Sequence, residues 1–239
     1  MGITHGYRYR RISYLQHFMV RPTLATLRSV NALSKLPVHE LEALLPVVRW
    51  CYCEAGGVIP NAYTEQGAVL FILSGYVKIV RGGAHRRTGP ARQSLDRRMR
   101  PRHEVMVALL SPGNMLGEAA AILGVEDTSS YIGLTPCQMV EVPRAKFLSY
   151  MQTYPAFAAA AAAHVARRQL HAEQQLELMR GDLEGRIHAL LRHCRVLGLD
   201  TEKWLSNAEI ARMVGATRVA VSQVMGRIQH QGNACTETT

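Results

Sequence analysis

The sequence predicts an α+β protein in which a small β-roll is followed by one long helix and then by a small helical domain. Three observations predict this order. Residues 47–142 alternate short β-prone runs with Gly and Pro, as small barrels and rolls do. Residues 156–179 are rich in alanine, the strongest helix former. Residues 206–228 space small, apolar and glycine residues as a helix-turn-helix does.

The N-terminal part is expected to hold a basic extension over residues 1–27 and the roll over residues 28–155. Inside the roll, residues 69–73 and 76–80 flank Ser74-Gly75, and this pattern predicts a hairpin. The other expected elements of the roll are strands at 105–110, 131–134 and 138–142 and an alanine-rich helix at 118–123.

Positive charge is concentrated in one segment of the roll. The net charge of the chain is +10, and residues 81–102 hold eight arginines against one acid, Asp96. Such a run cannot pack in a core, so it predicts an exposed insertion between two strands. Two interpretations stay open: a solubilising loop, or a loop that attracts nucleic acid without reading its sequence.

The long helix carries a narrow apolar stripe. A spacing of four and three residues is typical of a coiled-coil seam, and a stripe this narrow favours pairing with an identical helix over burial in a monomer. We therefore expect a homodimer through residues 156–180. Gly181 and Asp182 then end the dimerisation helix, 156–181, and begin a helix-turn-helix domain, 182–239. The seam comprises Ala158, Ala162, Val165, Gln169, Ala172, Leu176 and Met179.

The helix-turn-helix predicts double-stranded DNA as a partner. Ser206 is placed to cap the first helix and Thr217 the second, while Gly215 lies at the turn, where the backbone needs a positive φ. The N-terminal residues of the second helix in this motif meet base edges in the major groove. The candidate DNA-contacting residues are Ser206, Thr217, Arg218, Val219, Ser222, Gln223 and Arg227.

Composition and motifs limit which other classes of function we expect for the chain. No apolar run approaches the ~20 residues of a membrane helix, and the N-terminus does not resemble a secretory signal, so we expect a cytoplasmic protein without a membrane partner. No nucleophile–base motif, Walker loop or metal-hydrolase signature occurs, so an enzyme is not expected.

No cofactor or metal site is expected either. The five cysteines form no pair of CxxC motifs, and Cys51 and Cys53 are interpreted as core or surface thiols on one face of a strand. His164 and His171, on one face of the long helix, are interpreted as surface histidines rather than as haem or metal ligands.

The order of these parts resembles the cAMP receptor protein/fumarate–nitrate reductase regulator (Crp/Fnr) family over residues 28–232. The matching segments are FILSGYVKI at 71–79, LLSPGNMLGEAAAIL at 109–123, GDLEGRIHALL at 181–191 and GATRVAVSQVM at 215–225. They are similar to the family's hairpin, phosphate-binding cassette, hinge and recognition helix. The resemblance implies a homodimeric transcription regulator with a cyclic nucleotide-binding-like, effector-sensing roll and with RNA polymerase as a further partner.

The cassette departs from the family pattern. The family's glutamate is present as Glu118, but EDTSS at 126–130 stands where a phosphate-pairing arginine is expected, so the effector is expected to be other than cAMP, or there is none. Arg168 and Glu173 resemble a pair in the branch that senses 2-oxoglutarate. The candidate effector-pocket residues are Leu116, Gly117, Glu118, Ala119, Ser129, Ser130, Arg168 and Glu173.

The C-terminal domain also departs from the pattern. Residues 232–239 have neither an alternating apolar pattern nor a Lys or Arg, so the wing that contacts the DNA backbone in the family is expected to be truncated. The alternative function is therefore a sensor or protein-interaction module that has lost productive DNA binding. The sequence leaves open the effector, the operator and whether transcription is activated or repressed.

Overall fold

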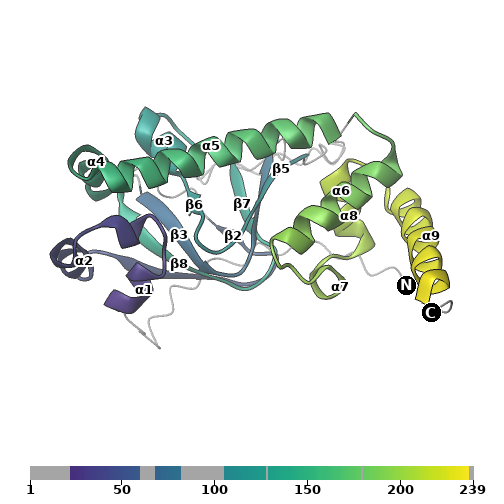
Figure 1. The fold of residues 1–239 in the computed structure, drawn as a ribbon, viewed down its shortest axis with the longest axis horizontal. Helices are drawn as coiled ribbons and strands as arrows, with labels where there is room; N and C mark the ends of the chain where they lie inside the picture. Colours follow the sequence, from purple (N-terminus) through teal and green to yellow (C-terminus); the bar gives the residue numbers. More distant parts are fainter. Residues whose placement is uncertain (1–21, 60–67, 82–104, 128, 179, 237–239) are drawn as a thin grey trace, which may run out of the picture. The chain divides into compact units, whose positions relative to one another are not determined.

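A computed structural model describes residues 22–59, 68–81, 105–127, 129–178 and 180–236, and Figure 1 shows the arrangement of its helices and strands. The chain forms two compact units, which are described separately. The first comprises Met1–Ile79 with Ala108–Ala172, and the second comprises Val80–Val107 with Glu173–Thr239. The α+β fold class predicted from the sequence is confirmed.

Three short helical elements precede the roll: α1 (Leu24–Arg28), η1 (Leu33–Lys35) and α2 (Val38–Leu44). Thr23 caps α1 by accepting a hydrogen bond from the amide of Thr26 at 3.2 Å. The helices bury their leucines against Phe71, Phe147 and Phe157, and this cluster forms the core of the first unit.

Two four-stranded sheets form the roll. The first has the order β1 (Arg49–Cys53), β8 (Cys137–Pro143), β3 (Ala68–Ser74) and β6 (Met115–Leu116). The second has the order β2 (Val58–Ile59), β7 (Ser130–Gly133), β4 (Val77–Arg81) and β5 (Val105–Leu110). The predicted strands at 105–110, 131–134 and 138–142 are confirmed, as is the helix α3 (Glu118–Leu123).

The predicted hairpin around Ser74-Gly75 is wrong. β3 pairs with β8 and β6, whereas β4 lies in the other sheet, so the chain turns a corner between sheets at this point. The backbone of the corner bonds to the segment before β8 instead. The amide of Tyr76 donates to Thr135 Oγ1 at 2.9 Å, and the Tyr76 carbonyl accepts from the amide of Leu134 at 2.7 Å.

The cysteines of β1 lie in the core of the roll, so of the two interpretations, core thiols or surface thiols, the first is confirmed. Cys51 and Cys53 are both buried, and Cys53 lies opposite the buried Cys137 on β8. Burial raises the pKa of Cys53 to about 11 and that of Cys137 to about 12, so both thiols keep their protons at neutral pH.

Helices complete both units. α4 (Arg144–Thr153) follows β8, and α5 (Pro155–Leu178) is the predicted long helix. The second unit contains α6 (Leu183–Val196), α7 (Thr201–Trp204), α8 (Asn207–Val214) and α9 (Arg218–Thr236). Asp182 caps α6, as predicted, because its Oδ1 accepts from the amide of Gly185 at 2.9 Å. The arginine-rich residues 82–102 and the extension 1–21 lie outside the described residues.

Gly75 should be the glycine of the roll least able to accept a side chain. It has φ +86°, and an added Cβ would meet the Pro136 carbonyl oxygen at 2.2 Å and Cys137 Sγ at 2.8 Å. Gly75→Ala should therefore lower the free energy of unfolding by about 3 kcal/mol, from left-handed strain plus overpacking.

Gly113→Ala is the matched control. Gly113 also has φ +86°, but an added Cβ would meet nothing within 4 Å, so only the strain of about 1 kcal/mol remains. Urea denaturation of both variants measures the difference, and equal losses would contradict the corner assigned to Gly75.

Candidate functional site

The helix-turn-helix of the second unit is built from α8 and α9. Ser206 Oγ accepts from the amide of Glu209 at 3.2 Å, and Thr217 Oγ1 accepts from the amide of Ala220 at 3.2 Å, so both predicted caps are present. Gly215 ends α8 at φ +65°. Local sequence therefore fixes where both helices begin and how the chain turns between them.

The first turns of α9 have one buried and one exposed face. Val221 and Val224 are buried against the rest of the unit, whereas the predicted base-reading residues are exposed. Val219 is 68% exposed. The exposed predicted residues at the start of α9 and beside it are Ser206, Thr217, Arg218, Val219, Ser222 and Gln223.

Arg227 lies further along α9 and has a partner within the second unit. Its Nη2 lies 3.1 Å from Glu184 Oε2 on α6, with both side chains solvent-exposed in part. Exposed pairs of this kind contribute ~0–1 kcal/mol, so the guanidinium can exchange this partner for another anion.

The cassette of the first unit centres on a buried carboxylate. Gly117 has φ +78°, which turns the chain from β6 into α3, and the side chain of Glu118 at the start of α3 is 0% exposed. Glu118 Oε1 pairs with Arg168 Nη1 of α5. Glu118 Oε2 is buried and has no hydrogen-bond partner among the residues that the structure describes.

One face of α5 brings Arg168 to the cassette. Phe157, Ala161 and His164 are buried, and Arg168 follows them at the same helical spacing of three and four residues. Figure 1 shows the N-terminal part of α5 lying along the roll, beside α3 and β6. The stripe that contacts the roll is therefore different from the predicted dimer seam.

The charged side chains around Glu118 do not favour the binding of an anionic ligand. Burial raises the pKa of Glu118, and Arg168 offsets only part of that effect. Asp127 adds a second carboxylate, which accepts from the amide of Ser129 at 2.9 Å and from the hydroxyl of Tyr131. Among the described residues, a cyclic phosphate placed here would meet the two acids Glu118 and Asp127 beside Arg168.

His164 corrects a prediction, because it is 5% exposed rather than a surface residue. Its Nε2 accepts from the amide of Met115 at 3.4 Å and lies 3.6 Å from Glu118 Oε1. Burial, with the neighbouring Arg168 and Arg167, lowers its pKa to about 4, so the imidazole is neutral at physiological pH. The candidate effector-pocket residues named from the sequence do not include His164 or Tyr131. For His164, its helical spacing from Phe157 and Arg168 is the signal that places it on the same face of α5.

The other predicted pocket residues are placed unevenly. Ser129 and Ser130 are buried beside Tyr131, and Leu116 is buried on β6. Ala119 is partly buried, whereas Glu173 is exposed near the end of α5. The structure therefore brings Leu116, Gly117, Glu118 and Arg168 together at one point.

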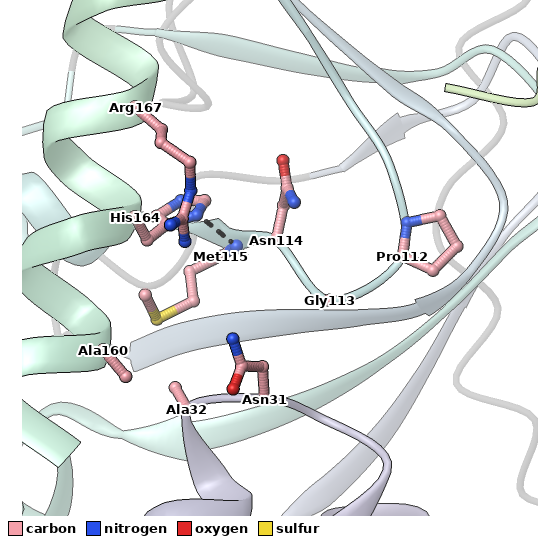
Figure 2. A pocket seen from close by; sticks show the side chains of 9 residues that line it. All are labelled: Asn31, Ala32, Pro112, Gly113, Asn114, Met115, Ala160, His164 and Arg167. Carbon is pink, nitrogen blue, oxygen red and sulfur yellow. Dashed lines mark hydrogen bonds between the residues drawn. The ribbon is translucent and has the colours of Figure 1, made fainter. Parts of the chain in front are cut away.

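A small cavity adjoins this cluster on the other side of His164. It has a volume of about 180 Å³ and lies between α5, the turn before β6 and the start of η1. Figure 2 shows Ala160, His164 and Arg167 on the α5 side, with Pro112, Asn114 and Asn31 across from them.

In the described part of the chain, no helix is long and apolar enough to cross a membrane, and no group of three or more metal-binding side chains could hold an ion.

Two family models match the chain. Residues 51–154 match the cyclic nucleotide-binding domain, and residues 204–232 match the bacterial regulatory proteins of the crp family. A curated relative, the cyclic AMP receptor protein of Thermus thermophilus, is 28% identical over 131 residues, and the match covers 54% of this chain and 60% of the relative.

Solved structures of similar fold cover more of the chain. The c-di-GMP-responsive regulator CLP of Xanthomonas campestris matches with a TM-score of 0.59 and 17% identity, over 82% of this chain and 93% of that protein. FixK2 of Bradyrhizobium japonicum matches with a TM-score of 0.58 and 17% identity, over 77% and 86%. At this identity the likeness concerns the fold.

Removing Arg168 should destabilise the first unit, because Glu118 would remain buried without its cation. Arg168→Ala is expected to lower the free energy of unfolding by about 3 kcal/mol. The control is Arg167→Ala, which makes the same change at the adjacent exposed residue and should cost less than about 0.5 kcal/mol. Urea denaturation measures both, and a stable Arg168→Ala protein would contradict the structural role of the pair.

Proposed function

Because the chain belongs to the Crp/Fnr family of transcription regulators, we propose that it is a cytoplasmic, homodimeric DNA-binding regulator whose activity responds to an effector other than cAMP, or to none. RNA polymerase would be a further partner, as for a regulator that acts at promoters. The family and the fold are those of regulators and not of enzymes.

The observation that carries DNA binding is the exposed start of α9. Arg218, Ser222 and Gln223 face solvent on a helix that packs firmly through Val221 and Val224. Arg218 suits a guanine edge, Gln223 an adenine edge, and the exposed Val219 a thymine methyl group.

Dimerisation through α5 is supported by the side chains that the roll leaves uncovered. The roll covers the stripe from Phe157 to Arg168, while Ala162 and Gln169 of the predicted seam are exposed and Val165 is only partly buried. These residues lie about a quarter turn from the roll-facing stripe. A second α5 could therefore pack against the seam without displacing the roll.

The proposal that cAMP is not the effector rests on charge. In the part of the chain that the structure describes, the cation beside Glu118 and Asp127 is Arg168, whose guanidinium is already paired. A phosphate would have to displace the Glu118 carboxylate and leave it buried and unpaired, which costs several kcal/mol.

The second candidate function is that of a sensor or protein-interaction module that has lost productive DNA binding. It is favoured by the low net charge of residues 182–239, where seven Lys/Arg are nearly balanced by six Asp/Glu. The predicted truncation of the wing, the domain boundaries and the role of the arginine-rich segment stay predictions.

DNA reading by α9 can be tested with fragments selected from a genomic library. Arg218→Ala should weaken binding to the selected fragment by about tenfold or more, since a bidentate arginine–guanine pair contributes ~1–3 kcal/mol of discrimination. Binding to random DNA should change much less.

Arg192→Ala is the control for charge, because it removes an exposed arginine of α6 in the same unit. Gel shifts at several salt concentrations measure all three proteins. If the wild-type protein selects no fragment and Arg218→Ala binds equally, the interaction-module function replaces the proposed one.

The dimer seam can be tested with charge. Val165→Glu with Leu176→Glu should give monomers in light scattering, because like charges would face each other across a two-fold axis. Ala163→Glu with Gln174→Glu has the same spacing on the far, exposed face and should leave the dimer intact. A dimer that survives the first pair of substitutions would refute this interface.

A further inference from the structure

The cavity beside His164 has the chemistry of an anion site. As far as the described residues go, its lining contains one guanidinium, from Arg167, and two carboxamides, from Asn31 and Asn114, but no carboxylate. The remaining lining is small or apolar, apart from the imidazole of His164. A site with a cation, amide donors and no acid favours a negatively charged ligand.

Three polar side chains of this cavity have no partners within the described part of the protein, whereas His164 accepts from the amide of Met115. Asn31, Asn114 and Arg167 make no side-chain hydrogen bond or ion pair there. The neighbouring Arg168, by contrast, is paired with Glu118. Consecutive arginines of α5 therefore differ: one is committed to the buried carboxylate, and the other faces the cavity (Figure 2).

The wall opposite α5 is held in place by backbone hydrogen bonds. The amide of Gly113 donates to the Ile72 carbonyl at 2.8 Å, and the Asn114 carbonyl accepts from the amide of Ile72 at 2.9 Å. The backbone of Asn114 is thus fixed to β3 before any ligand arrives. A wall whose backbone is already ordered binds a ligand with a smaller entropic cost.

The size of the cavity indicates the class of ligand. A volume of about 180 Å³ exceeds the ~150 Å³ of an engineered cavity that holds benzene, so a lone inorganic ion would leave most of the space unfilled. A short organic acid would fill it, with a carboxylate at Arg167 and its other polar groups at Asn31 and Asn114.

We propose that this cavity binds a small organic acid, at a site separate from the cassette around Glu118. The site joins three segments: the start of η1, the turn before β6, and α5. His164 lines the cavity, and its Nε2 also lies 3.6 Å from Glu118 Oε1. A ligand bound in the cavity would therefore affect the buried pair of Glu118 and Arg168. Ala160, His164 and Arg167 lie on the face of α5 away from the predicted seam, so dimerisation leaves the cavity open.

The proposal concerns the first unit and does not require DNA binding, so ligand binding is measured directly. Isothermal titration calorimetry of the full chain should detect succinate with a millimolar or tighter dissociation constant. Succinamide, which has the same skeleton without charge, should give no binding in that range. Arg167→Gln and Asn114→Ala should each weaken succinate binding by about tenfold or more.

Arg180→Gln, an exposed arginine outside the cavity, is the control and should bind as the wild-type protein does. Arg167 is exposed, so its variant should keep its fold, and circular dichroism verifies this. The proposal is overturned if succinate gives no heat of binding, if Arg167→Gln binds it normally, or if inorganic phosphate binds as tightly as succinate.

Discussion

The burial of Glu118 is the constraint on which the sensing unit depends. A carboxylate with no exposed surface is stable only beside a cation or as a neutral acid, and here Arg168 reaches it from α5. The pair fixes the position of α5 along the roll. Phe157 and Ala161 then pack in the same stripe, and the aromatic cluster of Phe147, Tyr150 and Phe157 closes the base of the helix.

The elements with local signals could be predicted from the sequence. α3 begins and ends where Gly117 and Gly124 adopt positive φ, and Ser206, Gly215 and Thr217 mark the helix-turn-helix by their own side chains or backbone. Strand pairing is different, because it depends on residues far apart in sequence. The segment around Ser74-Gly75 has the composition of a hairpin turn, yet the backbone of the following Tyr76 forms hydrogen bonds with residues 134–135.

The candidate site could be predicted only in part for the same reason. Glu118 and Gly117 lie in a recognisable motif, but the partner of Glu118 comes from fifty residues away on another element. The sequence favours a surface position for His164, because a histidine on a helix is commonly a surface residue. Its burial follows from which side of α5 meets the roll, and no local pattern determines that side. The cavity lined by Asn31, Asn114 and Arg167 depends on three separate segments.

α5 serves several neighbours at once with different sides of one rigid cylinder. One residue inserted after Phe157 would rotate everything beyond it by about 100°, so His164 would leave the roll and Val165 would leave the seam together. Substitutions at the exposed alanines would disturb one neighbour at most. The exposed positions of the helix should therefore vary in composition among related sequences. Its length should change only by insertions or deletions that keep each residue on the same face, such as seven residues.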